Sequence, residues 1–516
     1  MKPSIELFLL IKSLTKSEKR YFKLYSSLQA GDKNYLKLFD AIEKQSEYNE
    51  EAIKQKFKKE IFIRHLPSEK NHLYSLILKS LRTYHSENSV GSLLKELLKD
   101  MENLYNKALY KECNKVVNRV KKLAYDSEKF YYIIEIIGWE KQLADEEVLF
   151  GKLENNLEKL NNEEQQIIDK IRNLGEYQVL YSKINYVFRK GGYSRNEKER
   201  AIVEEVANHP LITGKNTALS VRAATMCYFI KGLCAITNGN LEEAHTNFRK
   251  VVDKMEQNAL IAKDLQRRYV KSLNYLLLYY IEYRKYDEFH KLITQMRALP
   301  LQAEFSSIDI KMKIFTATYN SELLVYARMG DFKKGIDIVE DVLTGMQTFQ
   351  GRIYKDEEIL FYYNIAYLYF GAEDYHKALY WINKVLNDPD KSGIRQDIFS
   401  FARIFNLIIH YELGNTDFLK YITNSAHRYH VKRQRDYKFE MMVFMYFKKL
   451  ANTVPTKQIV LFGELKNELQ RLLKDDNEKI ALQYFDFISW IGAKTEQKPF
   501  SEFVKKRIEL GLAENV

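Results

Sequence analysis

The amino-acid sequence predicts an all-α fold, namely a solenoid of antiparallel helix pairs that follows a helical N-terminal domain. Apolar residues recur at the three- and four-residue spacing of amphipathic helices along most of the 516 residues. Only 7 prolines and 20 glycines interrupt this pattern. Runs of alternating apolar and polar residues, which would indicate strands, are few. Units made of a helix, a turn and a second helix recur between about residues 220 and 425.

The composition restricts the class of protein further. Hydrophobic residues make up 46% of the chain, which is enough for a large core. No stretch approaches the roughly 20 apolar residues that cross a bilayer, and the apolar run 5–11 lacks the cleavage site of a signal peptide. Cys113, Cys227 and Cys234 form no metal or disulfide pattern, so we expect them in the core. The sequence therefore predicts a cytoplasmic protein without membrane association.

Residues 1–90 are predicted to form a compact helical domain, with 17 Lys and Arg against 11 Asp and Glu. Thr15 and Glu18 have the spacing of a capping box, which opens a helix that reaches residue 28. Further helices are expected over 34–45 and 49–62, and another begins at Pro67. The pair around residues 46–49 has helix-turn-helix proportions. Its second helix would offer Lys54, Lys58 and Lys59 to DNA, whereas the alternative is a solvated face on a capping domain.

Residues 91–195 are predicted to be helical with a less regular pattern. The segment 104–120 has the apolar spacing of the second helix of a pair. The Gly- and Ser-containing stretch 189–196 is the clearest linker in the chain, and we place a domain boundary there.

Residues 196–425 contain the legible repeats, and 359–389 is the clearest of them. Its first helix carries Tyr362, Ile365, Ala366 and Tyr369 on one face. A turn containing Asp374 follows, and the second helix carries Ala378 and Ile382 before Pro389 ends it. Equivalent positions in successive units are 45, 46, 43 and 41 residues apart; they are Ala244, Phe289, Gly335, Ala378 and Leu419.

This order of features resembles the tetratricopeptide repeat, although that family has a usual period of about 34 residues. The resemblance implies stacked helix pairs whose first helices line a concave surface that binds a protein or peptide. The layout is also similar to that of bacterial peptide-sensing regulators, which join an N-terminal DNA-binding domain to such repeats. The glutamine–alanine helix-turn-helix pattern usual in those regulators is absent here. Residues 426–516 are predicted to form helices that cap the end of the solenoid.

Motifs that would indicate an enzyme or a metal protein are missing from the sequence. The segment 214–217 lacks the first glycine and the hydroxyl residue of a P-loop, and no HExxH or CxxC occurs. His427 and His430 are three residues apart without a third ligand, which indicates a surface pair. We therefore expect no enzymatic activity, no cofactor and no metal.

The sequence offers two candidate binding surfaces. The concave face would carry a mostly apolar and aromatic set, which comprises Phe229, Leu233, Asn274, Asn320, Tyr363 and Tyr367. Either these residues form an open groove for an extended or helical peptide, or the superhelix is tight and they are core. The second candidate, over 427–438, is a basic patch with two tyrosines; its cations are Arg428, Lys432, Arg433, Arg435 and Lys438. It is either a solvated helix or a site for an acidic protein or RNA.

The sequence as a whole favours a scaffold or adaptor that binds a protein or peptide partner through the concave face. The alternative is a nucleic-acid-associated regulator with an N-terminal DNA-binding domain and partner-sensing repeats.

Overall fold

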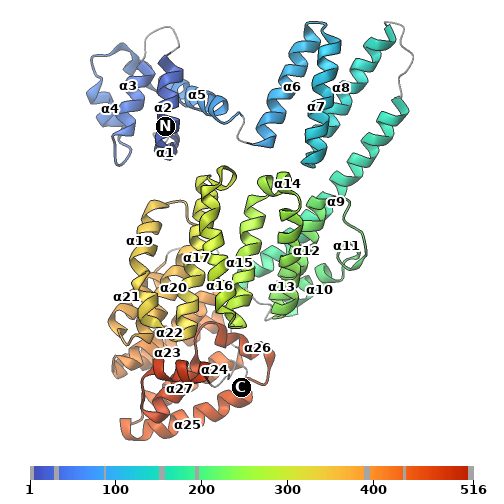
Figure 1. Cartoon of the computed structure of the whole chain (residues 1–516). Helices are drawn as coiled ribbons and strands as arrows, with labels where there is room; N and C mark the ends of the chain where they lie inside the picture. Colours follow the sequence, from blue (N-terminus) through green and yellow to red (C-terminus); the bar gives the residue numbers. More distant parts are fainter. Residues whose placement is uncertain are drawn as a thin grey trace. The chain divides into compact units, whose positions relative to one another are not determined.

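The computed structural model describes residues 5–27, 34–86, 89–149, 157–191, 197–388, 395–433 and 437–509 (Figure 1). Every regular element in these ranges is an α-helix or a short 3-10 helix, and none of them contains a β-strand. The predicted all-α class is therefore confirmed. The chain divides into two compact units, which comprise residues 1–167 and 168–516.

Unit 1 begins with five helices around a small core. They are α1 (Glu6–Ser13), α2 (Lys16–Ser27), α3 (Asn34–Glu43), α4 (Glu50–Lys56) and α5 (Leu66–Tyr84). Phe22, Phe39 and Leu73 are fully buried between them. The capping box is confirmed, because the backbone N–H of Thr15 donates to the Glu18 carboxylate at 2.7 Å and the N–H of Glu18 donates to the Thr15 hydroxyl at 3.2 Å.

The rest of unit 1 is a row of antiparallel helices. It comprises α6 (Val90–Asn106), α7 (Tyr110–Asp126) and α8 (Phe130–Leu149), each packed on the next, and the start of α9 (Leu157–Gly191). Lys121 of α7 pairs with Glu140 of α8 at 2.7 Å and with Glu163 of α9 at 2.9 Å. Cys113 is buried in this row, as expected.

The division between the units falls inside α9, not at the predicted linker 189–196. Helix α9 continues to Gly191, and residues 192–196 of that linker lie outside the described ranges. The part of α9 after residue 167 belongs to unit 2. Its buried residues Tyr177, Leu180, Ile184 and Val187 form one stripe at helical spacing, so this half packs into the unit 2 core.

Unit 2 is built from successive helix pairs that pack in chain order, in the manner of a solenoid. Short helices between the pairs account for part of the long repeat period. The pairs are α12 (Val221–Thr237) with α13 (Leu241–Glu256), α15 (Gln266–Glu282) with α16 (Tyr286–Ala298), α17 (Ile308–Met329) with α18 (Phe332–Asp337) and α19 (Val339–Thr348), α20 (Lys355–Gly371) with α21 (Tyr375–Leu386), and α22 (Gln396–Glu412) with α23 (Thr416–Lys432). Helix α14 (Ala259–Asp264) lies between the first and second pairs, and η2 (Leu299–Leu301) and η3 (Ala303–Phe305) lie between the second and third. Helices α10 (Glu197–Ala207) and α11 (Pro210–Thr213) precede the first pair.

Turn chemistry helps a helix pair to close, and small residues let neighbouring pairs pack closely. Gly239 adopts a φ of +77° that only glycine takes readily, and the Asn240 side chain then accepts the N–H of Glu243 at 3.1 Å to cap α13. A Cβ at Gly335 would lie 2.4 Å from a Leu368 methyl group, so the two helices approach too closely for a larger residue there. Ala378, at the equivalent position of the next pair, is fully buried.

The C-terminal helices first extend the solenoid and then return over it. Helices α24 (Lys438–Leu450) and α25 (Pro455–Leu472) follow α23 in order, and α26 (Asp476–Lys479), η4 (Ile480–Gln483), α27 (Phe487–Glu496) and α28 (Phe500–Glu509) complete the chain. Helix α28 packs on α17, where Lys505 pairs with Asp331 at 3.3 Å. No helix within the described ranges has the length and apolar character that a membrane crossing requires.

Candidate binding surfaces

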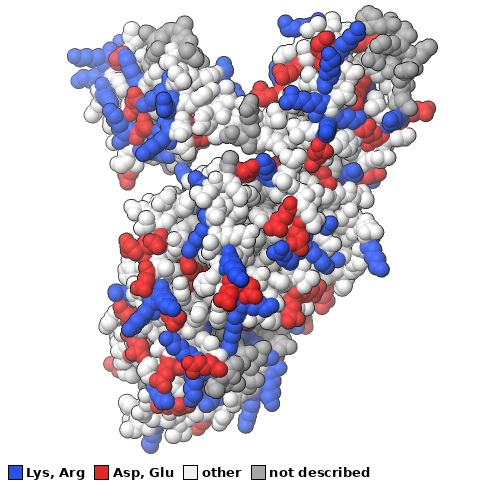
Figure 2. All heavy atoms as spheres, in the orientation of Figure 1, with Lys and Arg blue, Asp and Glu red and all other residues white. Residues whose placement is uncertain are grey.

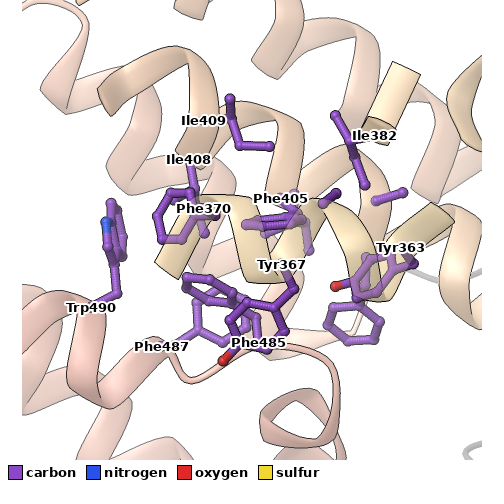
Figure 3. Close-up of a cluster of buried hydrophobic side chains, with 14 of the residues drawn as sticks. Tyr363, Tyr367, Phe370, Ile382, Phe405, Ile408, Ile409, Phe485, Phe487 and Trp490 are labelled. Atoms are coloured by element: carbon purple, nitrogen blue, oxygen red, sulfur yellow. The ribbon is translucent and has the colours of Figure 1, made fainter. Parts of the chain in front are cut away.

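Tyr363 and Tyr367, which the sequence placed either in an open groove or in the core of a tight superhelix, are core residues. Their exposed fractions are 4% and 5%. The Tyr363 hydroxyl donates to the carbonyl oxygen of Tyr484 at 3.1 Å, and the N–H of Asp486 donates to the Tyr367 hydroxyl at 3.1 Å. Figure 3 shows Phe485 beside Tyr367, and the two ring centres are 5.2 Å apart. The prediction of an accessible groove at this point is wrong, because the returning C-terminal segment covers α20.

Phe229 and Leu233, at the other end of the predicted groove, are also buried. Here the covering element is the second half of α9, whose Tyr181 ring lies 5.9 Å from the Phe229 ring, centre to centre. Residues Phe188 and Tyr275 make a similar contact at 5.7 Å. The aromatic and aliphatic residues of the predicted set therefore belong to the core and do not line an open groove.

The two asparagines of the predicted set belong to a different environment, which we call the inner polar cluster. It lies on the first helices of three neighbouring pairs and consists of Lys271 and Asn274 of α15, Asn320 and Ser321 of α17, and Glu357 and Asn364 of α20, with Arg268 one turn before Lys271 on α15. Lys271, Asn274 and Glu357 are half-buried, whereas Asn320 and Asn364 are buried beneath the surface. Sequence reasoning found Asn274 and Asn320 but missed the charged residues beside them.

The hydrogen bonds inside this cluster are long. Ser321 donates to the Asn274 amide oxygen at 3.4 Å, Asn364 donates to the Asn320 amide oxygen at 3.4 Å, and Asn320 donates to the Glu357 carboxylate at 3.5 Å. Ordinary N–H···O bonds are about 2.7–3.2 Å. The polar groups therefore satisfy one another only weakly, and a ligand with its own donors and acceptors can form shorter bonds with them.

Three charges of the cluster have no ion-pair partner within 4.0 Å among the described residues: Arg268, Lys271 and Glu357. The Lys271 ammonium donates to the Asn185 amide at 3.3 Å and lies 5.6 Å from the centre of the Phe229 ring. Arg268 donates to the Thr225 hydroxyl at 2.9 Å.

Burial perturbs all three charges. Burial, followed by the charge of Arg189, lowers the pKa of Lys271 to about 8, against the weaker attraction of Glu357 and Asp356. Burial, reinforced by the charge of Asp356, raises the pKa of Glu357. Burial also lowers the pKa of Arg268 to about 10. Burial thus disfavours the charged forms of both Lys271 and Glu357, which lie on the same inner face.

The basic patch is exposed as predicted, but one of its two tyrosines, Tyr429, is already in contact with arginines of the protein. Arg428, Lys432, Arg433 and Lys438 are exposed, and Arg435 lies outside the described residues. The ring of Tyr429 carries the guanidinium group of Arg403 at 3.4 Å and that of Arg433 at 4.5 Å from its centre. These two contacts occupy Tyr429, so we do not expect it to stack on a base.

His430 is fully buried, with its Nε2 atom 3.2 Å from the carbonyl oxygen of Ser400. The predicted surface histidine pair is therefore wrong for this residue. Position 430 faces the partner helices on the same stripe as Ala426 and Thr423, which are also buried.

The predicted DNA-binding helix is shorter than expected. Helix α4 ends at Lys56, and Lys58 and Lys59 are exposed in the turn that follows. Phe57 packs against Phe62 at 5.3 Å between ring centres, which redirects the chain towards η1 (Ile61–His65). Lys54 pairs with Glu51 at 2.8 Å and Glu50 at 3.4 Å. Basic side chains gather over α3 and α4 on the face drawn in Figure 2, but the three lysines do not share a helix.

The fold and these surfaces define an all-α, solenoid-like protein whose inner face is apolar where its own segments cover it and polar between α15 and α20. Within the described ranges, no group of three or more His, Cys, Asp and Glu side chains is arranged to hold a metal ion. None of the family models, curated proteins or solved structures compared with this chain matches it.

Proposed function

We propose that this chain is a non-catalytic binding protein that holds a peptide segment of a partner at the inner polar cluster. Its repeats resemble tetratricopeptide repeats, and stacked helix pairs commonly present such inner surfaces to partners. In this proposal the protein acts as a scaffold or adaptor in the cytoplasm, and the aromatic positions of the predicted groove contribute to its core instead of to binding.

The observation that carries the proposal is the pair of half-buried opposite charges, Lys271 and Glu357, without ion-pair partners in the described part of the chain. Removing a charge from water without pairing it is costly, and perturbed groups of this kind concentrate at functional sites. A structural role would be served better by an apolar side chain of similar volume. A ligand that supplies the missing partners explains why the charges are kept.

A peptide matches the chemistry of the cluster better than an apolar ligand. Its backbone alternates donors and acceptors, which the amides of Asn274 and Asn320 can bond more closely than their present partners do, at 3.4–3.5 Å. An acidic side chain of the peptide would pair with Lys271, and a basic side chain would pair with Glu357. The proposed ligand is therefore a polar segment that carries both signs of charge.

Selection from a displayed random-peptide library on the full-length protein tests this proposal. We expect enrichment of peptides with an acidic residue, and we expect Lys271→Met to lose that enrichment while Glu357→Gln changes the preference for basic residues. Lys311→Met is the matched control, because Lys311 is exposed on α17 and outside the cluster. If Lys271→Met and Lys311→Met select the same peptides as the wild type, the inner polar cluster is not the binding site.

A further inference from the structure

The solvent face of α23 carries an exposed stripe that the proposed function does not use. Phe418, Tyr421, Ser425, Arg428 and Lys432 follow one another at spacings of three, four, three and four residues, so they lie along one line of the helix. All five are exposed. At 1.5 Å per residue the stripe is about 21 Å long. We call these five residues the α23 stripe.

The aromatic end of the stripe is unusually open to solvent. Phe418 is 62% exposed and Tyr421 is 70% exposed. The large side chains beside them show the ordinary pattern, because Leu419 is fully buried and Ile422 packs against the core. Two adjacent aromatic rings one turn apart on an exposed face are therefore available to a flat, stacking ligand.

The other end of the stripe is basic and unpaired. Arg428 and Lys432 have no ion-pair partner within 4.0 Å among the described residues, and the same holds for Lys420, Arg433 and Lys438 around them. Asp417 is the only acidic residue in α23. Elsewhere in unit 2, exposed cations commonly have carboxylate neighbours, such as Arg249 with Asp253 at 2.8 Å and Lys377 with Asp374 at 3.1 Å. The local excess of positive charge complements a polyanion.

We propose that the α23 stripe binds single-stranded nucleic acid. Phosphates would meet Arg428, Lys432 and the neighbouring cations, and bases would stack on Phe418 and Tyr421. A duplex keeps its bases inside and would use the cations alone, and an acidic protein surface offers no flat faces to the two rings. The exposed aromatic pair beside unpaired cations therefore favours a single strand over both of these partners. This site is distinct from the inner polar cluster and does not depend on it.

The test is fluorescence anisotropy of the full-length protein with labelled 20-nucleotide oligo-U and oligo-dT, a 20-base-pair duplex and poly-glutamate. We expect the single strands to bind most tightly, with the logarithm of the association constant falling linearly with the logarithm of salt concentration. Arg428→Ala with Lys432→Ala should reduce that slope by about 1.4, since each phosphate contact on a single strand contributes about 0.7. Phe418→Ser with Tyr421→Ser should weaken binding about tenfold or more without changing the slope.

Lys457→Ala with Lys466→Ala is the matched control, because it removes the same charge from exposed positions of α25. We expect this variant to bind like the wild type. The proposal is overturned if the wild type does not bind the single strands in 50 mM salt, or if the duplex or poly-glutamate binds as tightly. It is also overturned if the α25 variant loses as much affinity as the stripe variants.

Discussion

Replacing Phe485 by alanine should strongly destabilise unit 2. Phe485 belongs to the returning segment that covers the inner face, and its side chain is 1% exposed. Its ring lies 5.0–5.6 Å, centre to centre, from five other rings; these belong to Tyr367, Phe370, Phe405, Phe487 and Phe500. Truncating a buried phenylalanine in such surroundings costs about 3–5 kcal/mol, because it loses burial and leaves a cavity that rigid rings cannot fill.

The measurement is urea unfolding followed by tryptophan fluorescence, since Trp490 lies in the same cluster (Figure 3). Phe418→Ala is the control, because this exposed phenylalanine should change the free energy of unfolding by no more than about 0.5 kcal/mol. A loss below about 1 kcal/mol for Phe485→Ala would refute the packing of residues 480–490 on α20. Tyr363 and Tyr367 would then again be candidates for an accessible groove.

Three other changes test separate parts of the fold. Asn406→Leu should raise the free energy of unfolding by about 1 kcal/mol in urea titrations, because the buried amide oxygen of Asn406 has no hydrogen-bond partner in the described structure. A clear decrease in the free energy of unfolding would show that this oxygen does have a partner. Burial raises the pKa of Glu18, but the hydrogen bonds from Thr15 and His85 outweigh burial and lower this pKa below 4.5. The Glu18 carboxylate therefore stabilises the fold above pH 4.5, and this contribution is lost as the pH falls through the folded-state pKa. Melting temperatures of unit 1 should therefore fall more steeply on acidification in the wild type than in Glu18→Gln, and parallel curves would contradict this. Ala378→Trp should cost about 1–3 kcal/mol or more by overpacking a fully buried position, and an unchanged melting temperature would mean that the repeat register is wrong.

Local features of the structure follow from the sequence, whereas contacts between distant segments do not. The capping box of Thr15 and Glu18 and the small residue Ala378 act over a few residues, so spacing alone identifies them. The burial of Tyr363 depends on Tyr484, which is 121 residues further along the chain. A signal for it was present, because every residue of the segment 359–370 except Asn364 is aliphatic or aromatic, and a helix of this kind is normally buried all round.

The inner polar cluster illustrates the same limit for function. The sequence pattern predicted Asn274 and Asn320 on the first helices of neighbouring repeats. The structure places them there, and both belong to the inner polar cluster. The sequence does not show that Lys271 lacks a carboxylate partner, because abundant acidic residues could have paired with it. Only the three-dimensional arrangement distinguishes an unpaired, half-buried charge from an ordinary surface lysine.

The most direct test of the proposed binding site combines a stability measurement and a binding measurement on Lys271→Met. Methionine keeps most of the side-chain volume and removes a half-buried charge whose pKa burial lowers to about 8. Because the unfolded lysine, with a pKa of 10.5, binds more protons above pH 8, the stability of the wild type should rise from pH 8 towards pH 10, and this rise should be weaker in the variant. At pH 7 we predict that Lys271→Met unfolds at an equal or higher urea concentration than the wild type and no longer retains the selected peptides. A variant that unfolds at a clearly lower urea concentration and still binds those peptides would contradict the account, because Lys271 would then be a structural residue.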